Sequence, residues 1–182
     1  ILTNKNLFEH DILTQIKKNS TIFHDLAKNV SAILDYAFTE MLNNAIEHSQ
    51  SLKIETTMEK RKDNISFCVI DKGVGIFNNI MKKRKLNNTM EAVQDLLKGK
   101  QSTAPEIHSG EGIFFTSKAA DIFTIQSGHK KILFNNLLED IFVKDIKNVA
   151  GTKVFFSIGF DSKKKLNDIF KKFTDDAFSF SK

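Results

Sequence analysis

The most regular hydrophobic pattern in the chain lies between residues 31 and 49. Apolar residues recur there at the i, i+1, i+4, i+5 spacing that gives a helix one broad apolar face, so we expect a long amphipathic helix over 31–49. Residues 8–29 show weaker helical spacing, interrupted near Asn19, and we expect Ser20 to cap a second helix. The positions that define the helix over 31–49 are Ile33, Leu34, Ala37, Phe38, Met41, Leu42, Ala45 and Ile46.

Downstream, extended runs and helical stretches follow one another in blocks. Residues 61–63 separate two extended runs, which predicts an antiparallel hairpin. Residues 99–110 lack periodicity, contain the only proline and are expected to form a loop. This order favours an α+β two-layer sandwich over a doubly wound parallel sheet. The expected strands are 52–60, 64–71, 122–126, 131–135, 139–144 and 153–158, with a strand-like segment at 177–181, and the expected helices are 76–84, 90–98, 111–120 and 163–173.

Composition narrows the class of protein. A length of 182 residues suits one domain, or one domain with a short appendage. The net charge of +5 fits a solubility role, and because no basic face alternates with aromatic residues we expect no nucleic-acid partner. The single cysteine, Cys68, lies in an apolar run and excludes an intrachain disulfide, which suits a reducing cytoplasm. No run approaches the length of about 18 apolar residues that spans a bilayer, so no membrane insertion is expected.

Three polar residues share one stripe of the helix predicted over 31–49. Glu40, Asn44 and His48 fall within about 80° of arc on a helix, at the edge of its apolar face. An amide oxygen from Asn44 suits Mg²⁺, which prefers oxygen ligands, and Glu40 could orient or deprotonate an attacking group. The alternative is that Glu40 and Asn44 are ordinary surface residues and that His48 only interacts favourably with the helix dipole.

A second cluster follows the strand predicted over 64–71. Asp71 is succeeded by Gly73 and Gly75, which permit backbone conformations closed to other residues and let the chain approach a ligand closely. A carboxylate at this place can accept a hydrogen bond from an exocyclic amine. The same pattern is also a common turn after a strand, so this cluster alone does not decide between a site and a turn.

A third cluster opens the helix predicted over 111–120. Gly110, Glu111, Gly112 and Ile113 stand where a loop becomes a helix, and unpaired N–H groups at a helix start bind phosphate. A Walker A loop and a Rossmann glycine motif are both absent from the sequence, which disfavours the other common nucleotide folds.

In this order, and with Gly151 and Thr152 leading the last strand, the three clusters resemble the GHKL ATPase superfamily, which includes histidine kinases, gyrase-type ATPases and anti-sigma-factor serine kinases. The resemblance spans approximately residues 32–158. Within it, Glu40, Asn44, Ala45 and His48 are most similar to the anti-sigma kinase form of the first motif. It implies the Bergerat fold, a mixed, mostly antiparallel sheet covered on one face by helices, with ATP and Mg²⁺ as ligands.

The resemblance also implies a role for each residue. Glu40 is similar to the general base and Asn44 to the magnesium ligand, while Asp71 is similar to the acid that bonds the adenine amino group and Thr152 to the threonine that supports it. The turn glycines and the start of the next helix would approach the nucleotide, and the preceding loop looks like the ATP lid. The residues expected to contact the nucleotide are Asn44, Asp71, Gly73, Gly75, Lys100, Ser102, Thr103, Gly110, Glu111, Gly112, Ile113 and Thr152, with Lys98 as a further lid cation.

The expected function is ATP hydrolysis or transfer of the γ-phosphate to a protein in a bacterial-type regulatory system. The alternative is a non-catalytic module in which ATP holds a partner-binding shape. A protein partner or phosphoacceptor and a homodimer are both compatible with the resemblance. His24 and Asp25 are similar to a histidine kinase acceptor box, but we expect coincidence, because His24 would lie inside the catalytic domain. We expect an N-terminal helical extension at 1–30, the ATP-binding domain at 31–160, and at 161–182 a helix that could begin a following domain of a longer protein.

Overall fold

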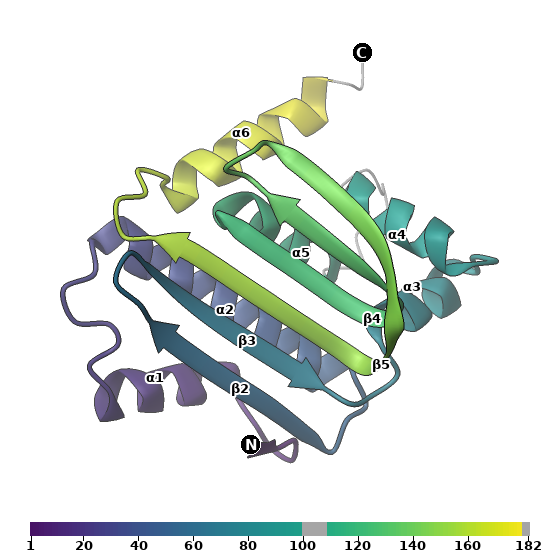
Figure 1. The fold of residues 1–182 in the computed structure, drawn as a ribbon, viewed down its shortest axis with the longest axis horizontal. Helices are drawn as coiled ribbons and strands as arrows, with labels where there is room; N and C mark the ends of the chain where they lie inside the picture. Colours follow the sequence, from purple (N-terminus) through teal and green to yellow (C-terminus); the bar gives the residue numbers. More distant parts are fainter. Residues whose placement is uncertain (100–108, 180–182) are drawn as a thin grey trace.

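The computed structural model describes residues 1–99 and 109–179 of the chain and shows a helical layer on a single sheet (Figure 1). Among these residues, no helix is long and apolar enough to cross a membrane. The elements in chain order are β1 (Leu2–Thr3), α1 (Glu9–Asn19), α2 (Lys28–His48), β2 (Lys53–Lys60), β3 (Asn64–Asp71), α3 (Ile76–Arg84), α4 (Thr89–Lys98), α5 (Ser109–Ala119), β4 (Ile122–Asn135), β5 (Asp140–Gly159) and α6 (Leu166–Ser179).

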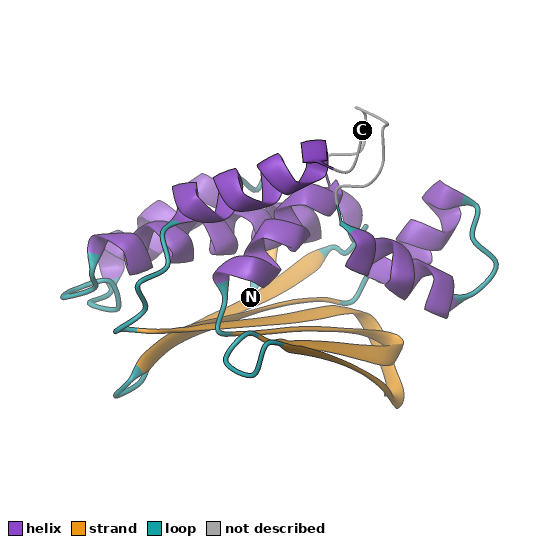
Figure 2. Ribbon diagram, turned by 90° about the horizontal axis from the view of Figure 1, so that it is seen from above, coloured by secondary structure: helices purple, strands orange, loops and turns teal. Residues whose placement is uncertain are grey.

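The strands form one sheet in the order β1-β2-β3-β5-β4, and the helices lie on one side of it (Figure 2). This arrangement confirms the predicted α+β two-layer sandwich. The expectation of a partly parallel sheet is not met among the described residues, because every pairing there is antiparallel. The reason is topological: β3 and β4 run in the same direction, but β5 folds back from β4 and lies between them.

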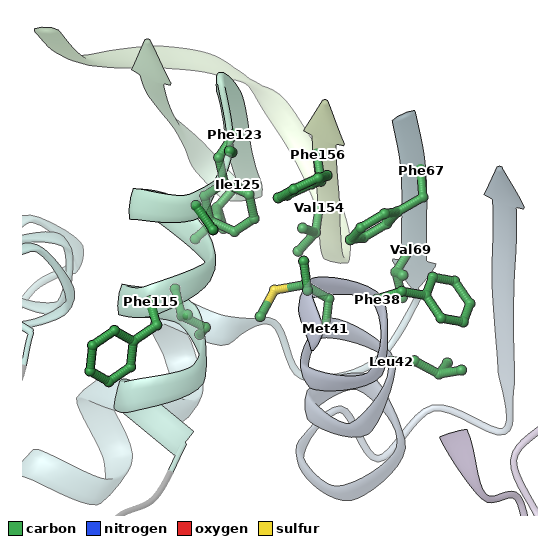
Figure 3. Close-up of a cluster of buried hydrophobic side chains, with 14 of the residues drawn as sticks. Phe38, Met41, Leu42, Phe67, Val69, Phe115, Phe123, Ile125, Val154 and Phe156 are labelled. Carbon is green, nitrogen blue, oxygen red and sulfur yellow. The ribbon is translucent and has the colours of Figure 1, made fainter. Parts of the chain in front are cut away.

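The core forms between α2 and the sheet, where the apolar face predicted for this helix is buried. Phe67 of β3 stacks on Phe156 of β5 at 5.0 Å between ring centroids, and Phe38 of α2 meets Phe67 edge-on at 5.4 Å. Figure 3 shows these rings together with Met41 and Phe123. Each buried ring stabilises the fold by about 1.5–3 kcal/mol through removal of apolar surface from water.

Helices from both ends of the chain join the same core. Ile12 and Leu13 of α1 and Ile169 of α6 are buried in it. Two aromatic residues of α6 pack edge-on against α5: the ring centroids of Phe170 and Phe115 are 4.8 Å apart, and those of Phe173 and Phe114 are 5.6 Å apart. The division into 1–30, 31–160 and 161–182 stays a prediction, and the flanking helices pack on the central segment.

Three local predictions are wrong. Ser20 does not begin a helix: its hydroxyl donates to the Ile16 carbonyl at 2.7 Å at the C-terminal end of α1, and turns lead from there to Lys28, because Asp25 adopts a positive φ of 61°. Of the segment 177–181, expected to be strand-like, residues 177–179 are helical, because the spacing of Leu166, Ile169, Phe170 and Phe173 builds an apolar face on α6, and residues 180 and 181 lie outside the described residues.

The four short strands predicted after α5 are in fact two long strands. Ser127 and Gly128, predicted to end a strand, lie at an irregularity inside β4, and Gly151 bends β5 with a φ of +69° while its ladder continues. β4 and β5 form a two-stranded ribbon, the β4–β5 ribbon, which bends back on itself. Asn136, in the turn between the two strands, therefore contacts the start of β4. The Asn136 backbone N–H donates to the Asp121 carbonyl at 2.9 Å, and its side chain donates to the carbonyls of Ser117 and Ala120.

Candidate functional site

The polar stripe predicted on α2 is present and lies at the edge of the buried face. The Asn44 amide nitrogen donates to the Glu40 carbonyl one turn earlier, at 2.9 Å. Because the nitrogen is committed to the helix backbone, the Asn44 amide oxygen is the atom available to face a cation or a polar ligand. His48 ends the helix, and burial, followed by the nearby Lys83, lowers the pKa of its imidazole and favours the neutral form.

Glu40 lies directly against the first turn of α5. A Cβ atom built on Gly112 would be 1.9 Å from Oε2 of Glu40, so only glycine fits at residue 112 with this carboxylate in place. The helix begins at Ser109, so Gly110, Glu111 and Gly112 contribute N–H groups to its unpaired first turn. The structure thus brings the acid of the first sequence cluster to the glycines of the third.

Burial and neighbouring carboxylates set the electrostatics around Glu40. Burial raises the pKa of the Glu40 carboxyl, and the charges of Glu9 and Glu47 raise it further. Tyr36, one turn before Glu40, has a phenol whose pKa is raised by burial and then by Glu40 and Glu111. Tyr36 was not predicted from the sequence, because a tyrosine on a helix carries no motif. The carboxylates of Glu40 and Glu111 therefore both lie near the first turn of α5.

Asp71 is the last residue of β3 and pairs in register with Thr152 of β5. Its Oδ1 accepts hydrogen bonds from the backbone N–H groups of Gly73 at 2.9 Å and Thr152 at 3.3 Å. The side chain is 3% exposed, and burial raises its pKa against the opposing effect of these hydrogen bonds. The acid is therefore fixed in orientation by its contact with β5.

The turn after Asp71 is attached to the C-terminal end of α2. A Cβ atom on Gly73 would be 1.8 Å from the Ser49 carbonyl oxygen, and the same carbonyl accepts from the Val74 N–H at 2.8 Å. Gly75 has a φ of +81° and precedes α3, whose first N–H, on Ile76, donates to Thr152 Oγ1 at 3.0 Å. Glycine is thus required at 73 for close approach and at 75 for conformation.

Two serines that support this turn were not predicted as site residues. Ser49 supplies the carbonyl that holds the turn, and Ser127 donates from Oγ to the Gly151 carbonyl at 2.7 Å. A Cβ atom on Gly151 would in turn be 2.2 Å from the Asp71 carbonyl oxygen. The only sequence signal for Ser127 is a buried polar residue beside a glycine in an otherwise apolar strand, which is also the signal of a strand end.

Both regions lie along one helix. Glu40 and Ser49 are nine residues apart, which is about 13 Å along a helix axis, and Asn44 lies between them. The stripe therefore connects the first turn of α5 with the turn that follows Asp71. An elongated ligand with a polar ring at one end and an anionic chain at the other matches this arrangement.

The other predicted contacts have different outcomes. Lys100, Ser102 and Thr103 lie outside the described residues. Lys98 is exposed at the end of α4. Ile113 is 5% exposed and its side chain packs in the core, so only its backbone is placed to meet a ligand. In the part of the chain that the structure describes, no three His, Cys, Asp or Glu side chains form a metal-binding cluster.

A comparison with protein families decides the class to which this arrangement belongs. The model of the histidine kinase-like ATPase domain matches residues 12–134, more than half of the chain. The chain belongs to this family. A histidine kinase-like ATPase domain is an ATP-binding module of the GHKL type, so the resemblance seen in the sequence is confirmed. No curated protein matches the chain in sequence.

The match covers the motif residues of this histidine kinase-like ATPase domain from Glu40 to Gly112 and ends before Thr152. In the structure, the backbone N–H of Thr152 nevertheless donates a hydrogen bond to the Asp71 carboxylate. Domains of this family bind ATP, generally with Mg²⁺.

Proposed function

We propose that this ATPase domain binds ATP with Mg²⁺ and hydrolyses it or transfers its γ-phosphate to a protein in a bacterial-type regulatory or signalling system. The observation that carries the proposal is the contact between Glu40 and Gly112, which sets a candidate base against a helix N-terminus suited to phosphate.

Asp71 is proposed to read the adenine ring. The carboxylate accepts backbone hydrogen bonds from Gly73 and Thr152 and a further one from the Thr152 hydroxyl, and because a carboxylate has about four lone-pair sites, an acceptor remains for the exocyclic amine of adenine. Guanine presents a carbonyl oxygen instead of an amine at the corresponding ring position, and an acceptor facing an acceptor is unfavourable. The Asp71 carboxylate therefore supports selection of adenine over guanine.

The first turn of α5 is proposed to bind the triphosphate. Its N–H groups favour anions, but the carboxylates of Glu40 and Glu111 lie near the same turn and oppose them. A divalent cation bound at this turn would reduce the conflict by offsetting the negative charges. The Asn44 amide oxygen would hold Mg²⁺, which takes few protein ligands together with substrate phosphates and neutralises charge that develops on them.

Glu40 is proposed to act as the general base. Its raised pKa makes it a better proton acceptor than an ordinary glutamate. In hydrolysis, Glu40 would orient water and accept its proton. In phosphoryl transfer, the hydroxyl of an acceptor protein would take the place of that water.

Calorimetric titration with ATP, ADP and GTP, with and without Mg²⁺, tests the binding assignment. We expect adenine-selective binding that strengthens with Mg²⁺ and weakens tenfold or more in an Asp71→Asn variant, because a charged hydrogen-bond acceptor is lost. An Asp63→Asn variant, changed at an exposed acid in the β2–β3 turn, is the matched control. Equal binding of all three nucleotides would contradict the proposal.

Turnover is tested separately with a Glu40→Ala variant that retains ATP binding. We expect a loss of at least a hundredfold in the rate of phosphate release, the contribution of a positioned general base. Undiminished turnover would remove Glu40 from this role. Tight binding by the unaltered protein with no turnover at all, even with candidate acceptor proteins, would instead support the non-catalytic regulatory module.

A further inference from the structure

Part of β5 in the β4–β5 ribbon lacks a strand partner on its second edge. In its C-terminal half, β5 has β4 on one side and β3 on the other, but β3 pairs only with residues 152–159. Residues 140–149 of β5 therefore pair with β4 alone, and within residues 1–99 and 109–179 no strand pairs with their second edge. Figure 1 shows this ribbon on the side of the sheet away from β2.

Residues 140–144 of this edge contain neither proline nor a bulge, two of the usual barriers to strand pairing. The ladder from Asp140 to Asp145 is regular, with irregularity only from Asp145 onward, so it offers an extended template. Charged side chains are a third barrier, but here the two charges, Asp140 and Lys144, are opposite in sign. Apolar side chains are exposed beside them: Ile141 is 44% exposed, and Leu137 and Leu138 in the adjoining turn are 69% and 68% exposed.

The sequence of the edge is complementary to itself. A two-fold axis perpendicular to a sheet leaves each side chain on the same face of the sheet. Even-numbered residues of one copy therefore lie opposite even-numbered residues of the other, and odd-numbered residues lie opposite odd-numbered ones. With the axis at Phe142, Asp140 of each copy lies opposite Lys144 of the other copy, and Ile141 of each lies opposite Val143 of the other. The two Phe142 residues lie opposite each other. Opposite charges and paired apolar residues are the contacts that stabilise antiparallel strands.

Neighbouring registers lack this complementarity. An axis at Val143 would place Ile141 opposite Asp145 and Phe142 opposite Lys144, so that within residues 140–146 no opposite charges face each other. The remaining acid of the ladder, Asp145, is already paired with Lys130 at 2.5 Å. Asp140 at present accepts a hydrogen bond at Oδ1 from the Ile141 N–H at 2.8 Å, as expected for an N–H on a free edge.

We infer that this edge, residues 140–144 of β5, binds the same edge of a second copy of the chain and forms a two-fold dimer with one continuous sheet. The N–H and carbonyl groups of Ile141 would pair with those of the partner's Val143. A contact of five residues on each copy buries less surface than a standard interface, which buries about 800 Å² per partner, so the dimer is weak and concentration-dependent. It lies on the ribbon and does not depend on nucleotide binding.

Sedimentation velocity over a range of concentrations tests the inference with the full chain. The average mass should rise from 20.7 kDa towards twice that value. Asp140→Lys and Lys144→Asp, each alone, place like charges opposite one another in both pairs and should each raise the dissociation constant about tenfold. The double variant restores opposite charges in both pairs and should recover the dimer, which a merely structural defect would not.

Two controls complete the test. Lys62→Asp reverses an exposed charge in the β2–β3 turn and should leave the dissociation constant unchanged. Asp71→Asn should dimerise like the unaltered protein, so failure of the nucleotide assignment is separable from failure of this one. A monomer at every concentration, a dimer indifferent to the single reversals, or a double variant that stays monomeric would each overturn the inference.

Discussion

Glu40 and Gly112 occupy adjoining space, and a side chain at residue 112 would displace the carboxylate. A Cβ atom there would be 1.9 Å from Oε2 and 2.9 Å from Cδ of Glu40. We predict that Gly112→Ala folds with a stability within about 1 kcal/mol of the unaltered protein, because alanine favours a helix and the Glu40 side chain can rotate. Turnover should fall tenfold or more, since small displacements of catalytic groups are costly.

Urea unfolding and phosphate-release assays check this prediction together. Gly128→Asn is the control, because a Cβ atom at Gly128 meets nothing within 4 Å and asparagine tolerates its φ of +54°. Turnover at the unaltered rate in Gly112→Ala would show that the contact does not position Glu40.

Gly151 is the glycine whose replacement should cost most stability. Its φ is +69°, and a Cβ atom would be 2.2 Å from the Asp71 carbonyl oxygen, a backbone atom that cannot rotate away. We predict that Gly151→Ala loses at least about 1–3 kcal/mol of unfolding free energy, measured by urea titration. Gly159→Ala, in the same strand, should lose less, because its two nearest contacts are side-chain oxygens and the nearest backbone atom is 3.7 Å away. Equal losses would contradict the clash.

The raised pKa of Glu40 predicts that Glu40→Gln increases the stability of the folded protein and that the increase depends on pH. Burial, then Glu9 and Glu47, raise the pKa above 4.5, so the ionised carboxylate destabilises the folded state. The folded state has no such penalty below the unfolded pKa, and the penalty develops as pH rises through the folded pKa. Glu40→Gln should therefore be more stable than the unaltered protein near neutral pH and similar to it below about pH 4. Unfolding titrations across this range check the sign, and a less stable variant at neutral pH would refute it.

Asn44 should account for the magnesium dependence of nucleotide binding. Chelation of Mg²⁺ should weaken ATP binding by the unaltered protein, and Asn44→Ala should lose most of the strengthening that the metal gives while binding metal-free ATP normally. Asn43→Ala is the control, because its amide points about 100° around the helix from Asn44. Calorimetry with and without the metal separates the two variants. An undiminished metal effect in Asn44→Ala would place Mg²⁺ elsewhere.

The sequence was informative where periodicity was strong. The helix expected over 31–49 is α2, from Lys28 to His48, and the hairpin expected on either side of residues 61–63 is β2 and β3. In both, the apolar period matches the face that is buried, so pattern and packing agree. The relation of Glu40 to Asn44 also followed from the sequence, because one helix fixes it.

The sequence was uninformative where tertiary contacts decide. Glycine and serine at 127–128 and 150–151 suggested strand ends, but a bent ladder uses the same residues to turn without stopping. Ser49 and Ser127 act through single hydrogen bonds across the fold, which no local pattern encodes. The contact of Glu40 with Gly112 joins residues 72 positions apart and was expected only from the resemblance of motifs.

The interlocked rings of α5 and α6 have a mechanical consequence. Phe114 and Phe115 belong to α5, the helix that begins with the glycines beside Glu40. Phe115 packs edge to face against Phe170 of α6, and Phe114 packs in the same way against Phe173. Close-packed rings of this kind do not slide independently. A tilt of α5 at its first turn would therefore displace α6 as well, so we expect a change beside Glu40 to alter the position of the C-terminal helix.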